Sequence, residues 1–198
     1  MVFSLRTERL ILEDMTGQDL EHMRKIACDS RVMKYVFIWL ENEEQIAGFV
    51  QHAIEESERA DRHDYHLAIR TPETRDFAGF ILLEIDPKQP TTAEVGYILL
   101  PEYWSSGYAQ EILRALLAFG FGELSLHRIY GKCDELNTAS AHVLEKGGLT
   151  YEGTIREHVW LRDHWRSTRY YGMLAEEYCA RNPGFNPCSA RRGSPGSC

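Results

Sequence analysis

A short loop of small residues leads into an apolar-faced helix near the middle of the chain, and this arrangement could bind an anion. The loop reads Trp104-Ser105-Ser106-Gly107-Tyr108-Ala109. Small side chains let backbone N–H groups approach a ligand closely, and a helix N-terminus adds unpaired donors and partial positive charge. The segment therefore suits a pyrophosphate, although a plain helix cap fits the same pattern. Neither a Walker lysine nor a Gly-x-Gly-x-x-Gly motif is present in the sequence.

An acidic residue interrupts the apolar strand that precedes this loop. Glu94 is followed by the segment Val95-Gly96-Tyr97-Ile98-Leu99-Leu100 and then by Pro101. Burying an unpaired glutamate is costly, so Glu94 needs a reason to be there. It could act as a general base, or it could pair with a neighbouring arginine or lysine.

The histidines and cysteines do not suggest a metal site. His63 and His66 form an isolated His-x-x-His in a predicted strand, where period-2 geometry points the two rings to opposite faces. The five cysteines are scattered and contain no Cys-x-x-Cys pair, namely Cys28, Cys133, Cys179, Cys188 and Cys198. We therefore expect no metal, and we expect reduced cysteines in a cytoplasmic protein.

The elements that must position these residues alternate between strands and amphipathic helices. The hydrophobic pattern predicts strands over 3–12, 65–70, 77–85, 93–100, 127–134, 150–162 and 167–175, and helices over 16–28, 43–59, 107–123 and 137–146. This order favours an α/β or α+β fold, with helices on both faces of a sheet. Prolines and glycines replace apolar residues after Tyr178, so we expect a domain over 1–178 and a loose C-terminal tail over 179–198.

Four segments resemble motifs of the GNAT N-acetyltransferase superfamily, both in their residues and in their order along the chain. The segment 101–109 is similar to its motif A, and Asn137 to Ser140 followed by 144–149 is similar to its motif B. Segments 5–12 and 171–178 resemble the branch that includes ribosomal-protein alanine acetyltransferases. The resemblance covers about residues 3–178. It implies a mixed, mostly antiparallel sheet with a splayed pair of parallel strands and flanking helices.

The resemblance also implies acetyl-CoA as co-substrate and a place for it. The cofactor would lie where strands 93–100 and 127–134 splay apart. Backbone groups of Ile98, Leu99 and Leu100 would pair with the pantetheine arm, and the loop from Trp104 to Ala109 would hold the pyrophosphate. Asn137 would hydrogen-bond the arm, or it would simply cap its helix, as asparagine often does.

The catalytic and acceptor residues follow from the same resemblance. Glu94 is the candidate base for the attacking amine. Many relatives have a tyrosine acid where Leu144 stands here, so Ser140 is the candidate proton source, with helix capping as its alternative role. Trp39 and Trp160 could wall the acceptor pocket, or they could be core or edge aromatics.

The charge balance constrains the partner. The chain has 30 acidic and 22 basic residues, a net charge of −8, and 181–198 contains arginines but no acid. Such acidity argues against a nucleic-acid partner and favours a cationic amine. The sequence also lacks a signal-peptide h-region and an apolar run long enough to cross a membrane, so we expect neither export nor a membrane partner.

We therefore expect an N-acetyltransferase that acts on a primary amine, preferably the N-terminal α-amine of a basic protein such as a ribosomal protein. One alternative acceptor is a small amine, such as a polyamine, an antibiotic or an amino-acid derivative. A non-catalytic acyl-CoA-binding module is the alternative from another class. A homodimer would be compatible with such a fold.

Overall fold

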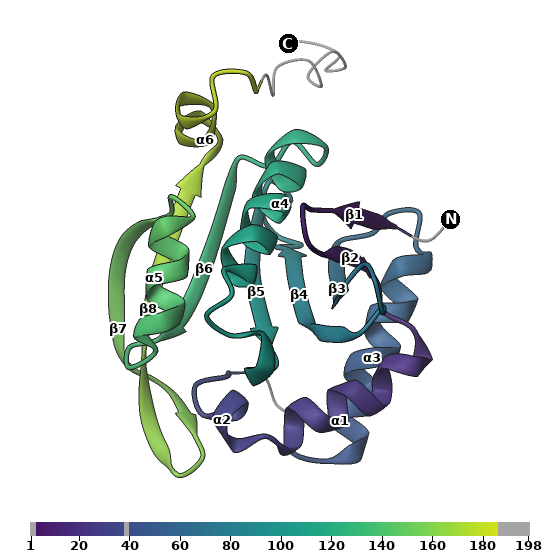
Figure 1. Cartoon of the computed structure of the whole chain (residues 1–198). Coiled ribbons are helices and arrows are strands. Elements are labelled where there is room, and N and C mark those ends of the chain that lie inside the picture. Colours follow the sequence, from purple (N-terminus) through teal and green to yellow (C-terminus); the bar gives the residue numbers. More distant parts are fainter. Residues whose placement is uncertain (1–2, 38–39, 186–198) are drawn as a thin grey trace.

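A single eight-stranded sheet runs through the computed structural model, which describes residues 3–37 and 40–185 (Figure 1). The strand order is β1-β2-β3-β4-β5-β6-β8-β7. All neighbouring strands are antiparallel except β5 and β6, which are parallel. The strands are β1 (Ser4–Arg6), β2 (Ile11–Asp14), β3 (Asp64–Arg70), β4 (Phe77–Ile85), β5 (Thr92–Leu99), β6 (Arg128–Asp134), β7 (Thr150–Leu161) and β8 (His164–Leu174).

Helices cover both faces of this sheet (Figure 1). Helices α1 and α3 pack on one face, whereas α4 and α5 pack on the other. The helical elements are η1 (Gly17–Asp19), α1 (Leu20–Cys28), α2 (Ser30–Met33), α3 (Glu43–Glu58), η2 (Pro101–Tyr103), α4 (Tyr108–Gly122), α5 (Thr138–Lys146) and α6 (Ala175–Arg181). Among the described residues, none of these helices has the length and apolar composition that crossing a bilayer requires.

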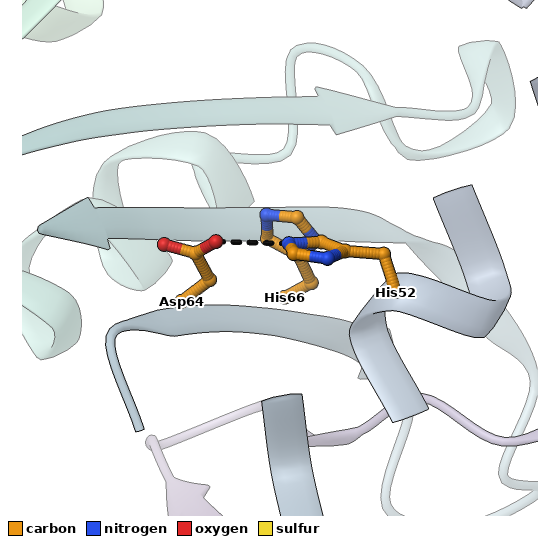
Figure 2. Close-up of side chains that lie close together, drawn as sticks. All are labelled: His52, Asp64 and His66. Atoms are coloured by element: carbon orange, nitrogen blue, oxygen red, sulfur yellow. Dashed lines mark hydrogen bonds and ion pairs between the residues drawn. The ribbon is translucent and has the colours of Figure 1, made fainter. Parts of the chain in front are cut away.

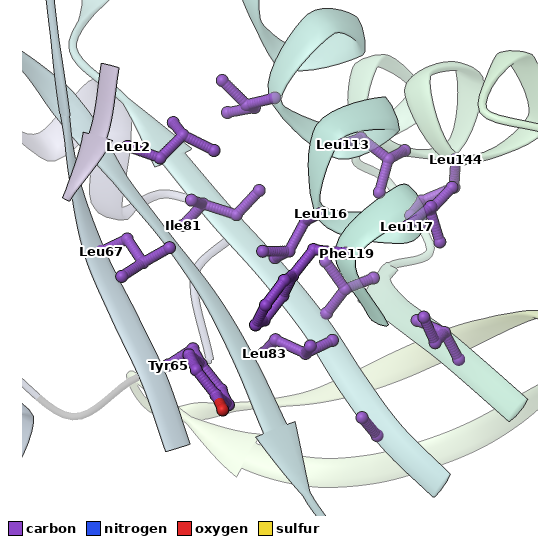
Figure 3. Close-up of a cluster of buried hydrophobic side chains, with 14 of the residues drawn as sticks. Leu12, Tyr65, Leu67, Ile81, Leu83, Leu113, Leu116, Leu117, Phe119 and Leu144 are labelled. Atoms are coloured by element: carbon purple, nitrogen blue, oxygen red, sulfur yellow. The ribbon is translucent and has the colours of Figure 1, made fainter. Parts of the chain in front are cut away.

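The alternation of buried side chains along β4 explains why both faces are covered. Ile81 and Leu83 point into the cluster beneath α4, where Leu113, Leu116 and Leu117 meet them (Figure 3). Phe80 and Leu82 lie in the separate cluster beneath α1 and α3. Since successive strand residues face opposite sides, a strand that is apolar at every position must be buried between two layers.

The structure confirms the predicted fold class, a mixed α/β sheet with one parallel pair, and most of the predicted elements. The prediction of one strand over 3–12 is wrong. Thr7 to Leu10 form a turn in which the Thr7 hydroxyl donates to the Leu10 carbonyl, so the segment becomes the antiparallel pair β1 and β2. The short helices α2 and α6 were not predicted, because neither is long enough to show a clear period.

The structure describes residues 179–185 of the expected tail. Helix α6 runs to Arg181, so the expected domain boundary at 178 falls inside a helix. The Phe185 ring then packs edge-on against Tyr178, with the ring centroids 4.8 Å apart. Residues 186–198 of the expected tail lie outside the described residues.

Candidate active site

The parallel pair β5 and β6 separates part of the way along its length and leaves a cavity between the strands. Their register runs from Thr92 opposite Arg128 to Val95 opposite Gly131. Beyond that point β5 pairs only with β4, and β6 pairs only with β8. The cavity has a volume of about 200 Å³ and is lined by residues of β4, β5, β6, α5 and the loop after α2.

Two carboxylates from neighbouring strands face this cavity. Glu94 Oε2 lies 2.8 Å from Lys132 Nζ and accepts a hydrogen bond from the Tyr130 hydroxyl at 3.2 Å. Glu84 lies directly across the β4–β5 register from Glu94 and also lines the cavity. The side chain of Glu94 is thus in the ion pair that the sequence allowed as its structural role, and it is also at the cavity, where a base would have to be.

Glu84 has a different partner. Its Oε1 lies 2.8 Å from Nε2 of His66, a buried ring on β3. This hydrogen bond, together with the charge of Lys132, lowers the pKa of Glu84 in spite of the opposing effect of burial. The cavity therefore contains a carboxylate that stays ionised at neutral pH.

A pair of hydroxyl groups lies at the α5 side of the cavity. The Tyr97 and Ser140 oxygens are 3.2 Å apart. Burial raises the pKa of Tyr97 to about 12, and the hydrogen bond with Ser140 opposes that shift only partly. The Asn137 side-chain oxygen accepts from the Ser140 backbone N–H at 3.1 Å, so Asn137 caps α5 and also lines the cavity.

The predicted anion loop has the geometry of a tight turn into a helix. Ser105 has a φ of 58° and Gly107 a φ of 83°, both in the left-handed region, and α4 starts at Tyr108. The Arg9 side chain crosses over this turn. Its Nη1 donates to the Ser106 carbonyl at 2.9 Å, and its guanidinium carbon lies 4.7 Å from the Tyr108 ring centre.

Arg9 is held there by α4 itself. Its guanidinium pairs with Glu111 at 2.7 Å, and its backbone N–H donates to the same carboxylate. The loop from Trp104 to Ala109 thus presents a helix N-terminus and an arginine side by side. The sequence pointed to the helix N-terminus but not to Arg9, which is about a hundred residues distant along the chain.

The backbone groups predicted to receive the pantetheine arm lie at the end of β5. Ile98 pairs in register with Phe80 of β4. The Leu99 carbonyl accepts from the Trp104 indole N–H at 2.7 Å. The Leu100 N–H donates to the Ala78 carbonyl at 2.9 Å, so this amide points toward β4 and away from the splayed side.

One wall of the cavity is formed by the loop after α2, which the long β7–β8 hairpin supports. Tyr35, Val36 and Phe37 line the cavity. Arg162 Nη1 donates to the Val36 carbonyl at 3.1 Å, and Arg166 Nη2 donates to the Lys34 carbonyl at 2.8 Å. The hairpin thereby fixes this wall.

The structure describes only one of the two tryptophans that were predicted to wall the acceptor pocket. Trp160 lies on the hairpin with about half of its surface exposed, and it packs edge-on against Trp165 rather than lining the cavity. Trp39 lies outside the described residues.

Several cavity residues were not predicted. Glu84, Tyr97, Lys132 and Cys133 line it beside the predicted Glu94, Asn137 and Ser140. Tyr97 could have been found, because it lies directly before Ile98 and three residues after Glu94 in the same strand. Glu84 and Lys132 are ordinary charged residues near strand ends, and only the sheet register places them at the cavity.

The chain is similar to known acetyltransferases. Residues 9–150 match the acetyltransferase (GNAT) domain family. Over 174 residues, the chain is 28% identical to the uncharacterized N-acetyltransferase YnaD of Bacillus subtilis, covering 88% of this chain and 98% of that protein. It is 26% identical to the spermidine N(1)-acetyltransferase of Escherichia coli, covering 87% of this chain and 91% of that protein.

Solved structures share the fold. A GNAT-family acetyltransferase from Bacillus anthracis superposes with a TM-score of 0.75 at 29% identity, covering 88% of this chain and 99% of that one. The RimL ribosomal L7/L12 α-N-protein acetyltransferase, solved in complex with coenzyme A, superposes with a TM-score of 0.76 at 18% identity, covering 87% of this chain and 98% of that one. At that identity the second likeness establishes the fold alone.

Proposed function

We propose that this chain, which belongs to the GNAT acetyltransferase family and is an acetyl-CoA-dependent N-acetyltransferase, acts on a protein N-terminal α-amine. That amine attacks the thioester of acetyl-CoA directly. The observation that carries the proposal is the cavity between β5 and β6. Two carboxylates line it from the β4 and β5 side, and a hydroxyl pair lines it from the α5 side. These are the groups that an incoming ammonium and a departing thiolate each require.

The amine must lose a proton before it attacks. Glu94 accepts that proton, directly or through a water molecule, while Glu84 attracts the ammonium form into the cavity. Lys132 offsets the repulsion between the two carboxylates from its position 2.8 Å from Glu94. This division of roles keeps one negative charge for binding and one acceptor for the proton.

The departing thiolate needs the opposite chemistry. Tyr97 stays protonated at neutral pH, since its pKa is about 12, and its hydroxyl is in contact with Ser140. The proton passes from Ser140 to the sulfur, and Tyr97 replaces it through their shared hydrogen bond. As the tetrahedral intermediate collapses, its nitrogen loses its second proton, which returns to Tyr97 through solvent. Tyr97 then takes the place of the tyrosine acid that Leu144 replaces in this sequence.

Acetyl-CoA binds along the end of β5 and the start of α4. The N–H groups of Ser106, Gly107 and Tyr108 and the side chain of Arg9 meet the pyrophosphate. Gln110, in the first turn of α4, has a buried side-chain amide whose oxygen and nitrogen have no protein partner among the described residues. A group of the bound cofactor supplies the missing hydrogen bonds.

The size of the cavity favours a peptide acceptor. A cavity of about 200 Å³ accommodates one small residue, and the rest of a chain must then lie outside it. The exposed Trp160 and Trp165 on the neighbouring hairpin offer an apolar surface of the kind that binds peptides.

Cys28, Cys133 and Cys179 form no disulfide in the described part of the chain, in keeping with the cytoplasm as the place of the reaction.

A polyamine acceptor is the second candidate. It is favoured by the two cavity carboxylates and by the 26% identity to the spermidine N(1)-acetyltransferase of Escherichia coli. Each candidate predicts a different substrate pattern.

The test is to measure CoA release from acetyl-CoA with three kinds of acceptor. These are peptides with free N-termini, the same peptides with blocked N-termini, and spermidine. Transfer to free but not blocked peptides supports the first candidate, whereas transfer to spermidine alone supports the second. Acetyl-CoA binding without turnover on any amine would make the chain a binding module, and a failure to bind CoA would refute the site.

A further inference from the structure

Three side chains of types that can bind a metal lie together at the start of β3, outside the cavity. His52 of α3 and Asp64 and His66 of β3 each offer one ligand atom, and these atoms lie within 4.8 Å of one another (Figure 2). His52 Nε2 is 2.8 Å from Asp64 Oδ2. Asp64 and His66 are two residues apart in the strand, so they share the face that α3 covers.

His66 is buried and has one ring nitrogen without a partner. Only 2% of the residue is exposed, and its ring stacks on Phe49 with the ring centroids 5.0 Å apart. One nitrogen, Nε2, meets the Glu84 carboxylate at 2.8 Å. The other, Nδ1, is buried and has no hydrogen-bond partner among the described residues.

These two observations favour one tautomer of the neutral ring. When Nε2–H donates to a carboxylate in neutral imidazole, the lone pair is on Nδ1. A buried lone pair without a partner is costly, whereas a metal ion would use it directly. Metal-bound histidines commonly donate their other ring N–H to a carboxylate in this way, which fixes the tautomer and increases the basicity of the ligand.

We propose that His52, Asp64 and His66 bind a divalent transition-metal ion such as Zn²⁺, with His66 Nδ1, His52 Nε2 and Asp64 Oδ2 as ligands. Two imidazoles and a carboxylate suit zinc, and water completes its four-coordinate shell. Ligand atoms around tetrahedral zinc are about 3.3 Å apart, so the His52–Asp64 contact must open by about half an ångström. His52 can make this movement, because its side chain is half exposed on α3.

The surrounding charges favour a cation. Glu84 carries its negative charge next to His66, and the buried Glu56 accepts the backbone N–H groups of His63 and Asp64. The sequence pattern singles out only His63 and His66, and it argues against a metal role for that pair. His63 precedes β3 and takes no part in the cluster, whereas His52 and Asp64 reach His66 only because α3 packs on β3.

Metal binding can be measured without the transfer reaction. The chelator-treated protein is titrated with Zn²⁺ by calorimetry and with Co²⁺ by its visible absorption. We expect one equivalent to bind, a tetrahedral Co²⁺ spectrum and a higher Tm in the presence of Zn²⁺. His52→Ala and Asp64→Asn should each weaken binding at least about tenfold, and Glu84→Gln should weaken it by about 10- to 100-fold through the orientation of His66.

His127→Ala and Asp61→Asn are the matched controls, because both side chains are exposed and lie outside the cluster. They should bind like the original protein. If neither ion binds at micromolar concentration, or if His52→Ala and Asp64→Asn bind as tightly as their controls, the site does not exist. Binding with an octahedral Co²⁺ spectrum would also overturn the proposed ligand set.

Discussion

Glu84 and Glu94 are directly opposite each other across β4 and β5, and both face the cavity where the parallel strands separate. Like charges in this position repel, and they persist only where other groups compensate. Lys132 compensates by its charge from the side of Glu94, and His66 compensates by a hydrogen bond from the side of Glu84. An acceptor ammonium that enters between the two carboxylates would add a second positive charge, so the pair would favour binding of a cationic acceptor.

Replacing Glu94 by Gln should separate its catalytic role from its structural one. We expect kcat to fall by roughly 10²- to 10⁴-fold, because that is the contribution of a positioned general base, with little change in the Kd of CoA. Steady-state kinetics and calorimetry provide the two measurements, with the exposed Glu73→Gln as control. A variant whose pH–rate profile superimposes on that of the original protein would remove Glu94 as the base.

The Tyr97–Ser140 contact should behave as one functional unit. Tyr97→Phe and Ser140→Ala each remove one hydroxyl of the proton path, so each should lower kcat by about 10- to 100-fold. The double variant should lose little more than either single one, since both changes interrupt the same path. Fully additive losses in kcat would show that the two hydroxyls act independently. Tyr151→Phe on the exposed edge strand β7 serves as control.

Much of the fold could be predicted because its long elements have strong periods. Helix α4 places Ile112, Leu113, Leu116 and Leu117 on one face, and Asn137 caps α5 as its residue type suggests. The turn at Thr7 and the helix α6 could not be predicted, since short elements depend on long-range contacts. Thr7, for example, is held by the Glu111 carboxylate of α4 at 2.6 Å.

The site was predictable only where a residue stood out from its local pattern. Glu94 did, because it is a lone charge in an apolar strand. Glu84 is the next-to-last residue of its strand and His52 is on the outer part of a helix, so both look like ordinary surface residues. Their roles arise from pairings that no sequence spacing reveals: β4 against β5, and α3 against β3.

Gly107 should be required for its backbone conformation. Its φ of 83° costs a side chain about 1–2 kcal/mol, and a Cβ would lie 3.4 Å from Arg9 Nη2. Gly107→Ala should therefore lower the free energy of unfolding by about 1 kcal/mol and weaken CoA binding. Gly48→Ala is the matched control. It lies within α3 with open space around it, so it should be stabilising by a similar amount.

Urea unfolding and CoA titration measure both effects of the Gly107 change. Wild-type CoA affinity in a destabilised Gly107→Ala protein would contradict the placement of the pyrophosphate at this turn.

The Cys133 thiol should react slowly and should respond to CoA. Burial raises its pKa to about 11, so only about one molecule in a thousand carries the thiolate at pH 8. Its alkylation rate should rise about tenfold per pH unit from 7.5 to 9.5, because the thiolate fraction does so below the pKa. Cys133 also lines the cavity, and bound CoA should slow its labelling further.

Peptide mass spectrometry after iodoacetamide treatment distinguishes Cys133 from the exposed Cys28, which is the internal reference. Equal labelling rates for the two at pH 8, or no protection by CoA, would exclude this placement of the thiol.

The buried pair Arg166 and Asp134 should affect both the stability of the domain and the position of the loop after α2, which lines the cavity. Both side chains are buried, the arginine bonds to the carboxylate, and its Nη2 also holds the Lys34 carbonyl. Arg166→Met leaves a buried charge unpaired, so the free energy of unfolding should fall by about 3–5 kcal/mol. The double variant Arg166→Met/Asp134→Leu should recover most of this loss, because no lone charge remains. Its KM for the acceptor should nevertheless stay raised, since the Lys34 carbonyl has lost its anchor.

Arg156→Met on the exposed face of β7 is the control and should change neither the free energy of unfolding nor KM. A double variant as unstable as the single one would show that the ion pair itself stabilises the domain.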